Sequence, residues 1–544
     1  MPHPLAGEKV DLCAAEDIPS LIAQYYVSRP EFSHASQLVS FGTSGHRGSS
    51  LNQSFNESHI LAITQALCDY RRQVGIKGPM YVGKDTHALS TPAFMSALEV
   101  LVANEVSVRI EEGFTPTPVI SHAILTHNRL TQTALADGVV ITPSHNPPCD
   151  GGFKYNTPNG GPADTDVTGW IQKKANGYLH NQLHGVKRVA YERAMKSSFV
   201  KVEDFISRYV DDLDRVIDMK AISDSKLKLG VDPMGGAGIK YWEAIGERYG
   251  IDLEIVNPCV DPTFSFMHYD HDGKVRMDCS SPYAMRGLLD MMDRFDLAFG
   301  NDPDFDRHGI VTKTGGLMNP NHYLSTAIDY LFRLRCNWRD SMAIGKTLVS
   351  SSMIDRVGAN LSKKVIEVPV GFKWFVAGMH QGTLGFGGEE SAGASFLDKQ
   401  GLPWSTDKDG MIMNLLSAEM MARQGKDPYQ RYMELEAKHG KAYYARIDAP
   451  ANDEARVKLK NMNAMDIAAY QLAEEKINHV YTHATGNGEA IGGVKVVTDN
   501  GWFAARPSGT EPIYKIYAES FISSEHLAQI QQEARSMVDK VMGL

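Results

Sequence analysis

Three times along the chain, a short apolar run typical of a strand leads directly into a polar loop. The runs 138–141, 296–300 and 382–387 end at the loops 142–148, 301–307 and 388–393. The segments before them follow a βαβ-type pattern, such as strands at 80–83 and 106–110 around a helix capped by Ser90 or Thr91. Because α/β proteins place ligands at the carboxyl ends of buried strands, these loops are the candidate functional sites. The recurrence predicts three similar α/β domains of mixed sheet flanked by helices, sharing one cleft.

The character of the chain changes near residue 440. Two strand patterns, 494–498 and 502–506, flank an Asn-Gly turn, and a further strand at 513–518 precedes a final helix from about Ser524. This pattern predicts a smaller C-terminal α+β domain. We predict an N-terminal arm at 1–38, α/β domains at 39–204, 205–322 and 323–440, and the α+β domain at 441–544.

Composition narrows the class of protein. Hydrophobic residues make up 43% of the 544 residues, charged residues 22%, and no run approaches the apolar length of a membrane span. A net charge of -10 argues against a nucleic-acid binder and suits a small phosphorylated ligand held in a local basic pocket. The acidic first forty residues lack the features of a signal peptide, and the six cysteines form no Cys-x-x-Cys pair. We therefore expect a cytoplasmic protein with free thiols and no zinc site.

The loop Thr142-Pro143-Ser144-His145-Asn146-Pro147-Pro148 contains three prolines, which fix φ and hold a loop in one conformation. Ser144 stands just beyond a buried strand, where α/β proteins usually place ligands. Ser, Asn and Pro are also ordinary turn residues, so a plain tight turn is an alternative. A second loop, 41–48, has three glycines around Arg47, whose guanidinium is suited to a phosphate.

Asp302, Asp304 and Asp306 alternate along a segment that we expect to be extended, which would place their carboxylates on one side. Such groups repel one another unless a cation lies among them, and an all-oxygen set favours Mg²⁺. The alternatives are a solvated acidic loop or an EF-hand. The EF-hand pattern fails because Arg307 and Lys313 replace the required glycine and glutamate.

Two further loops offer ligands for a sugar phosphate. The segment Arg506-Pro507-Ser508-Gly509-Thr510 combines a guanidinium, two hydroxyls and exposed backbone amides, which is a compact set of phosphate donors. Glu389 and Ser391 are suited to hydrogen bonds with vicinal sugar hydroxyls, and a purely structural loop is the alternative. The glycine turn at 235–238 fits no nucleotide-binding pattern, and we interpret it as a tight strand-to-helix connection. Together the loops have the components needed for phosphoryl transfer to a sugar phosphate.

Four of these motifs occur in the order found in one enzyme family. Thr-Pro-Ser-His-Asn-Pro, Asp-x-Asp-x-Asp-Arg, Gly-Glu-Glu-Ser and Arg-Pro-Ser-Gly-Thr resemble the motifs of the α-D-phosphohexomutases, from about residue 40 to the end of the chain. The resemblance implies four domains in a heart-shaped arrangement around a central cleft. It also implies interconversion of glucose 1-phosphate and glucose 6-phosphate through a phosphoserine and a glucose 1,6-bisphosphate intermediate. The partners implied are small hexose phosphates, with the oligomeric state, monomer or homodimer, left open.

The resemblance also implies roles for individual residues. Ser144 carries the phosphate and, with Asp302, Asp304 and Asp306, holds one Mg²⁺. The other implied residues are Lys154 for acid–base work, Arg47 and Arg307 beside the same chemistry, Lys373 as a further active-site position, Glu389 and Ser391 on the sugar 3- and 4-hydroxyls, and Arg506, Ser508, Gly509 and Thr510 on the phosphate that is not reacting. Charge balance is the alternative role for Lys154, because a base must first lose its proton.

Two departures from the family pattern and three rival functions accompany this hypothesis. Pro303 and Phe305 stand where other branches have glycine, and Glu390 with Ala392-Gly393 favours glucose over mannose. The nearest rival is a mutase of mannose or glucosamine phosphates. A phosphatase of the Asp-x-Asp-x-Thr type is disfavoured because Asp306 replaces the threonine. A non-catalytic sugar-phosphate binding protein is the third alternative.

Overall fold

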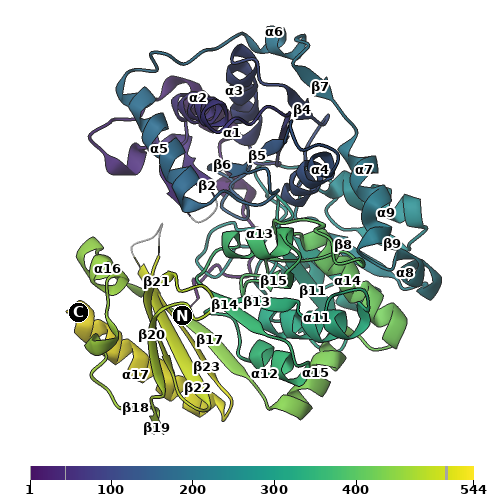
Figure 1. Cartoon of the computed structure of the whole chain (residues 1–544), viewed down its shortest axis with the longest axis vertical. Coiled ribbons are helices and arrows are strands. Elements are labelled where there is room, and N and C mark those ends of the chain that lie inside the picture. The colour runs from purple at the N-terminus through teal and green to yellow at the C-terminus, as the bar shows by residue number, and fades with distance from the viewer. Residues whose placement is uncertain (1, 43–44, 509–512, 544) are drawn as a thin grey trace. The chain divides into compact units, whose positions relative to one another are not determined.

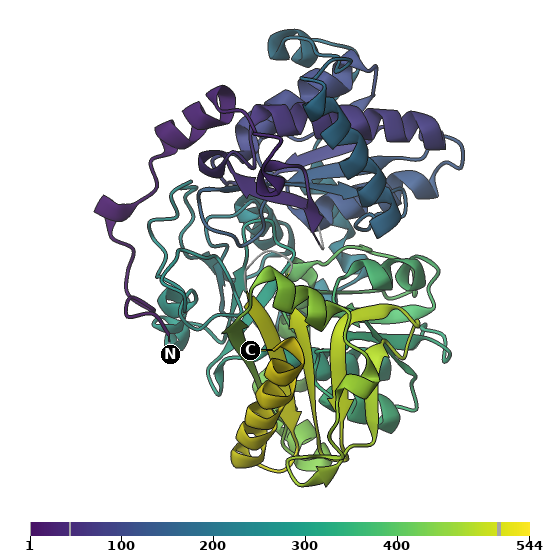
Figure 2. The same ribbon diagram turned by 90° about the vertical axis from the view of Figure 1, so that its left-hand side faces the viewer.

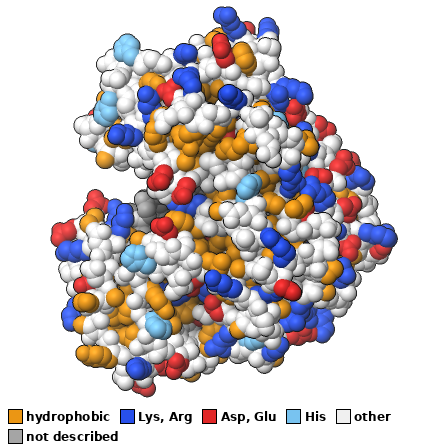
Figure 3. Space-filling model, viewed as in Figure 1, with side chains coloured by type: hydrophobic (Ala, Val, Ile, Leu, Met, Phe, Trp, Pro, Cys, Tyr) orange, Lys and Arg blue, Asp and Glu red, His pale blue; other side chains and the backbone are white. Residues whose placement is uncertain are grey.

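The computed structural model describes residues 2–42, 45–508 and 513–543, and the chain forms two compact units. Unit 1 comprises Met1–Met318, Phe375–Gly382 and Ser391–Asp427, and unit 2 comprises Asn319–Trp374, Thr383–Glu390 and Pro428–Leu544. Acidic and basic side chains are interspersed over the face drawn in Figure 3. Among the described residues, no helix combines the length and apolar character needed to cross a membrane.

The first sheet of unit 1 has seven strands in the order β1-β2-β6-β5-β3-β4-β7 (Figure 1). The strands are β1 (Phe41–Gly42), β2 (Gly45–Ser49), β3 (Met80–Lys84), β4 (Val108–Ile110), β5 (Asp137–Ile141), β6 (Asp150–Asn156) and β7 (Val200–Val202). Strands β5, β3, β4 and β7 are parallel, whereas β6 is antiparallel to β5 and β2. The helices around this sheet are α2 (Glu57–Val74), α3 (Ser90–Ala103), α4 (Thr117–Arg129), α5 (Thr165–His180) and α6 (Tyr191–Met195). Every residue of β5 is buried, as expected for a central parallel strand covered on both faces.

The second sheet of unit 1 has the order β12-β11-β10-β8-β9. Its strands are β8 (Leu229–Asp232), β9 (Leu253–Ile255), β10 (Leu297–Asn301), β11 (His308–Thr312) and β12 (Gly316–Leu317). Strands β9, β8 and β10 are parallel, and β11 returns antiparallel to β10. The accompanying helices are α7 (Phe205–Asp212), α8 (Met219–Ser225), α9 (Ile239–Tyr249) and α10 (Arg286–Leu289).

Residues 391–427 belong to unit 1, although the sequence analysis places them in the third α/β domain. They contain β16 (Ala394–Phe396) and α14 (Gly410–Gln424), and α14 packs against β10, β11 and α8. The segment before α14 therefore lies beside the loop that follows β10.

In unit 2, strand β13 (Ala343–Thr347) lies between two parallel partners, β14 (Val365–Val368) and β15 (Leu384–Gly388). Helices α11 (Pro320–Leu334), α12 (Met353–Asn360) and α15 (Pro428–His439) pack against one another, and α13 (Lys373–His380) is divided between the two units. The strand predicted at 346–350 is wrong by three residues. The apolar residues Ala343 and Ile344 begin β13, and the chain turns after Thr347.

The remaining sheet of unit 2 is fully antiparallel, in the order β17-β23-β22-β21-β20. The elements of this part are β17 (Tyr443–Pro450), α16 (Asp453–Lys460), β18 (Gln471–Leu472), β19 (Glu475–Lys476), β20 (His479–His483), β21 (Ala490–Val497), β22 (Gly501–Pro507), β23 (Ile513–Ser520) and α17 (Ser524–Met542). Helices α16 and α17 pack on this sheet around a core of their own. Three mixed α/β parts and a C-terminal α+β part confirm the predicted fold class.

Candidate active site

The serine loop, residues 142–148, begins where strand β5 ends. Ser144 is buried and has a φ of 62°, a left-handed conformation that residues other than glycine rarely adopt. Its backbone N–H donates to Thr142 Oγ1 over 2.8 Å, and Thr142 Oγ1 donates to Asp85 Oδ2 over 2.7 Å. The loop lies so close to β6 that a Cβ at Gly152 would stand 2.0 Å from the Thr142 carbonyl oxygen. The serine is thus held in a strained conformation by buried partners as well as by proline.

Asp85 and His87, which follow the carboxyl end of β3, form hydrogen bonds with this loop. His87 Nδ1 lies 2.7 Å from Asp85 Oδ2, and His87 Nε2 lies 3.0 Å from the Asn146 carbonyl oxygen. Burial works against both charges, but the pairing outweighs it, so the pKa of Asp85 is lowered and that of His87 is raised. The predicted helix cap is wrong: Ser90 is the first residue of α3, and its hydroxyl donates to Asp85 Oδ1 over 2.5 Å.

The metal loop, residues 301–307, brings the three aspartates together. Asp302, Asp304 and Asp306 are at most 1% exposed, and each offers a ligand oxygen within 4.8 Å of the other two. The expected extended segment is wrong, because the Phe305 N–H donates to the Asp302 carbonyl over 2.8 Å and Phe305 has a φ of 62°. A turn, and not strand alternation, makes the carboxylates converge.

The glycine turn at 235–238 packs directly against the metal loop. A Cβ at Gly236 would lie 2.6 Å from Pro303 Cα, and one at Gly238 would lie 2.2 Å from the Phe305 ring. The Ala237 N–H also donates to the Pro303 carbonyl over 2.8 Å. The connection predicted between strand and helix therefore has a second role as the surface on which the metal loop rests.

The aspartates fit a hard divalent cation. Among the described residues, no donor makes a hydrogen bond to Asp304 Oδ1 or Asp306 Oδ1, although both oxygens are buried. Burial and the neighbouring Asp304 and Asp306 raise the pKa of Asp302 well above the usual range. Ser144 Oγ donates to Asp302 Oδ2 over 2.8 Å, so the serine hydroxyl adjoins the unsatisfied carboxylates.

Two lysines offset part of this negative charge. Lys154 Nζ, on β6, lies 2.6 Å from Asp304 Oδ2 and 3.0 Å from Asp306 Oδ2, and Lys408 Nζ lies 2.8 Å from Asp306 Oδ2. Burial disfavours the charged form of Lys154, but Asp304 and Asp306 outweigh it and raise its pKa. Burial likewise acts to raise the pKa of Asp306, but Lys154 and Lys408 hold it well below its usual value. Sequence reasoning missed Lys408, which is far along the chain and lies in no motif that we singled out.

Arginine side chains flank the same group. The backbone N–H of Arg307 donates to Asp302 Oδ1 over 3.0 Å, and the side-chain Nη1 of Arg307 lies 3.6 Å from Asp278 Oδ2. Arg47 Nη1, on β2, donates to Asn146 Oδ1 over 3.3 Å. Unit 1 thus gathers Ser144, Lys154, Arg47, Arg307 and the three aspartates, as the sequence predicts. It adds Lys408 and Asp278, together with Thr117, whose hydroxyl donates to Asp304 Oδ2 over 2.6 Å.

The predicted sugar and phosphate ligands are distributed over both units. Glu389, after β15 in unit 2, is buried and accepts a hydrogen bond from the Gly371 N–H over 3.1 Å. Lys373 Nζ, at the start of α13, lies 4.5 Å from the centre of the Trp374 ring, and Arg506 lies in β22. Ser391 belongs to unit 1.

Part of the predicted phosphate segment is described. Ser508 is buried after β22, and its carbonyl accepts a hydrogen bond from Arg456 Nη1 over 3.1 Å. Gly509 and Thr510 lie outside the described residues. Their predicted role therefore stays a prediction.

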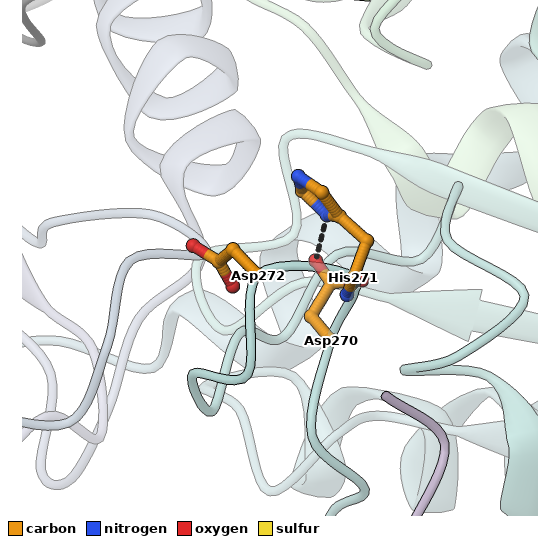
Figure 4. Close-up of side chains that lie close together, drawn as sticks. All are labelled: Asp270, His271 and Asp272. Carbon is orange, nitrogen blue, oxygen red and sulfur yellow. Dashed lines mark hydrogen bonds and ion pairs between the residues drawn. The ribbon is translucent and has the colours of Figure 1, made fainter. Parts of the chain in front are cut away.

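In the acidic turn Asp270-His271-Asp272, side chains of types that can ligate a metal also bring one potential ligand atom each within 4.8 Å of one another. Figure 4 shows His271 paired with Asp270, and their Nδ1–Oδ2 distance is 3.3 Å. Asp270 Oδ1 also accepts from Ser281 Oγ over 2.5 Å, and Asp272 pairs with Arg276 over 2.9 Å. These carboxylates already have partners, so the acidic turn is not a second candidate metal site.

The fold and this site define a class: an α/β protein with an α+β C-terminal part and a buried serine beside an acidic triad. Four family models match the chain, described as phosphoglucomutase/phosphomannomutase alpha/beta/alpha domain I, domain II, domain III and the C-terminal domain. They match residues 38–181, 207–316, 319–439 and 454–537. The chain belongs to this family, the α-D-phosphohexomutases, which confirms the resemblance.

Similar proteins include a phosphoglucomutase of Komagataeibacter xylinus, which is 58% identical over 98% of this chain and 97% of its own length. A solved structure of a putative phosphomannomutase from Thermus thermophilus has a TM-score of 0.72 at 25% identity, covering 92% of this chain and 99% of its own. Parafusin, a phosphoglucomutase from Paramecium, has a TM-score of 0.74 at 21% identity and shares the fold over 95% of this chain and 97% of its own.

Proposed function

We propose that this chain is a phosphoglucomutase, which interconverts glucose 1-phosphate and glucose 6-phosphate through a phosphoserine at Ser144 and a glucose 1,6-bisphosphate intermediate. The observation that carries the proposal is the 2.8 Å hydrogen bond from Ser144 Oγ to Asp302, within a buried triad that keeps two oxygens unpartnered among the described residues. The phosphoglucomutase that is 58% identical over almost the whole chain supports glucose as the sugar.

Asp302, Asp304 and Asp306, with an oxygen on the phosphorylated Ser144, would hold one Mg²⁺. Bound there, the ion supplies positive charge where negative charge develops on the transferring phosphoryl group. Lys154 and Lys408 offset part of the negative charge of the triad, because both ammonium groups contact Asp306. The charge of the triad is thus balanced by protein groups as well as by the cation.

Phosphoryl transfer breaks the bond from phosphorus to Ser144 Oγ and forms one to the oxygen of the sugar hydroxyl. In the net exchange, the proton of that hydroxyl replaces the phosphoryl group on Ser144 Oγ. The raised pKa of Lys154 keeps its ammonium charged, so we assign it charge balance and not proton abstraction. Arg47 and Arg307 would bind phosphoryl oxygens, since a guanidinium presents several donors in one plane. The return transfer restores the phosphate on Ser144 and releases the isomer.

Glu389, Ser391 and Lys373 would bind the sugar, and Arg506, Ser508, Gly509 and Thr510 the phosphate that is not reacting. The hydrogen bond from the Gly371 N–H to Glu389 Oε1 supports this role, because it orients a buried carboxylate. The six unpaired cysteines suit a reducing compartment, and we propose a cytoplasmic enzyme, monomeric or dimeric.

A coupled assay tests the function. Purified protein receives glucose 1-phosphate, mannose 1-phosphate or glucosamine 1-phosphate, each with Mg²⁺ and a trace of its bisphosphate. We expect the highest kcat/KM for glucose 1-phosphate. Preference for another sugar would reassign the substrate, net phosphate release would indicate a phosphatase, and no turnover of any sugar would overturn the proposal.

A further inference from the structure

The N-terminal arm precedes the part of the chain that the family models match, which begins at residue 38. Its first segment pairs with the second α/β part of unit 1. The Gly7 N–H donates to the Tyr269 carbonyl over 2.8 Å, the Tyr269 N–H to Glu8 over 2.9 Å, and the Val10 N–H to Met267 over 3.1 Å. The Val10 side chain is buried in the core of that part. The arm therefore extends a neighbouring segment in the manner of an added strand.

The arm then crosses to the first α/β part, as the purple trace in Figure 2 shows. Helix α1 (Ile18–Val27) buries Leu21 and Tyr25 completely in the core of that part. Tyr25 Oη donates to Ser96 Oγ over 3.0 Å, and the Leu21 carbonyl accepts from Ser50 Oγ over 2.7 Å. The arm is thus anchored by buried side chains at both ends, in two different cores.

The segment paired with the arm leads directly to the active site. After Met267 and Tyr269, the chain makes a turn closed by the bridge between Tyr269 and Val275. Two residues later, the Met277 N–H donates to the His145 carbonyl over 3.2 Å, next to Ser144. The following residue, Asp278, forms the ion pair with Arg307 that adjoins the last aspartate of the triad. One short segment therefore contacts both the serine loop and the metal loop.

From this continuity we infer that the N-terminal arm is a positioning strap. It holds the segment 267–278 in place, and that segment fixes the serine loop relative to the metal loop. Phosphoryl transfer is sensitive to such placement, because a displacement of about 1 Å costs up to ~100-fold in rate. The inference rests on the proposed mutase function for its activity readout only.

Two variants weaken the contacts between the N-terminal arm and the segment 267–278 by different means. Val10→Asp removes the buried anchor, and Gly7→Pro removes the donor to Tyr269 and is incompatible with the Gly7 φ of 84°. Leu12→Asp is the matched control, since Leu12 is 73% exposed, and Val10→Ile is the conservative variant. For each protein we measure hydrogen exchange of the Met277 amide, together with kcat and KM for glucose 1-phosphate.

We expect Val10→Asp and Gly7→Pro to accelerate exchange at Met277 by about tenfold or more and to lower kcat by about 10- to 100-fold. KM should stay within about twofold, because the proposed sugar ligands lie elsewhere, and Val10→Ile and Leu12→Asp should match the wild type. Unchanged exchange, faster exchange with unchanged kcat, or an effect confined to Val10→Asp would each overturn the strap. A wild-type protein without mutase activity would defeat the proposed function instead, and the exchange data would still decide whether the arm holds the segment.

Discussion

The metal loop and the acidic turn at 270–272 each place three potential metal-ligand atoms within 4.8 Å of one another, yet the surroundings of the two groups differ. In the metal loop the aspartates are buried, and Asp304 Oδ1 and Asp306 Oδ1 have no hydrogen-bond donor among the residues described. In the acidic turn, His271 and Ser281 pair with Asp270, and Arg276 pairs with Asp272. Unsatisfied buried charge, more than proximity, therefore distinguishes a cation site from a structural turn.

The pKa of Asp302 in the metal loop and the pKa values of Asp270 and Asp272 in the acidic turn shift in opposite directions. Burial and two neighbouring carboxylates raise the pKa of Asp302, so its negative charge is disfavoured until a cation arrives. In the acidic turn, burial is outweighed by hydrogen bonds from His271 and Ser281 at Asp270, and by Arg276 at Asp272, and both pKa values are lowered. Protein groups thus favour the charged form of both carboxylates of the turn, whereas in the metal loop the lysines pair with Asp304 and Asp306 and the negative charge of Asp302 stays disfavoured.

Removing one side chain from each region should give the largest difference in activity between the metal loop and the acidic turn. We expect Asp304→Ala to lower kcat by about three orders of magnitude or more with the fold retained. His271→Ala removes the imidazole of the acidic turn and should leave kcat within about twofold, because that side chain is half-exposed and pairs with Asp270, outside the proposed metal site. Steady-state kinetics at saturating Mg²⁺ measures both variants.

The effect of Mg²⁺ on thermal stability gives a second measurement for Asp304→Ala and His271→Ala. After chelation, added Mg²⁺ should raise the Tm of the wild type and of His271→Ala but not that of Asp304→Ala, since only a cation that binds the folded state stabilises it. Near-normal activity of Asp304→Ala at limiting Mg²⁺, or loss of the Mg²⁺ response in His271→Ala, would contradict the assignment.

A smaller effect is expected at the glycine turn that supports the metal loop. Gly238→Ala places a Cβ 2.2 Å from the Phe305 ring and should lower kcat about 10- to 100-fold by displacing the loop. Gly246→Ala, in α9 of the same part, is the matched control, because its Cβ meets nothing nearer than 3.6 Å. It should retain activity and gain up to about 1 kcal/mol in the free energy of unfolding. Equal activities of the two variants, measured by the coupled assay, would show that the glycine turn does not support the loop.

The smallest effect concerns pH and the acidic turn. The folded pKa of Asp272 is lowered, so its ion pair with Arg276 contributes stability above the unfolded pKa of about 3.9, which is lost as pH falls through the folded value. Asp272→Asn should therefore lower the Tm by no more than about 3 °C at pH 7, and the difference should shrink below about pH 4. Thermal melts across this pH range measure it, and a difference that grows on acidification would refute the assigned ion pair.

The sequence predicts the candidate loops of unit 1 because each follows a strand whose apolar run is easily identified. Ser144, the three aspartates, Lys154, Arg47 and Arg307 were all predicted, and unit 1 brings them together. The backbone geometry within the loops was harder to predict from the sequence. The left-handed φ of Phe305 and the turn that makes the carboxylates converge depend on the glycine surface beneath them, which only the fold brings there.

Contacts between segments that are distant in the chain could not be predicted from the sequence for the same reason. Lys408 lies 102 residues after Asp306 in the sequence, yet its ammonium is 2.8 Å from that carboxylate. Asp278 and the N-terminal arm likewise act through tertiary contacts that no local pattern encodes. The periodicity of apolar residues indicates burial and secondary structure. Which distant residues come into contact depends instead on how the helices and sheets pack.

The central claim, that Ser144 carries the transferring phosphoryl group, is tested most directly by intact-mass measurement after incubation with glucose 1,6-bisphosphate and Mg²⁺. We expect one phosphate per wild-type chain, located on Ser144, none on Ser144→Ala, and its loss from the wild type when glucose 1-phosphate is added. A phosphate that persists in Ser144→Ala, or mutase turnover by that variant at the wild-type rate, would contradict the account.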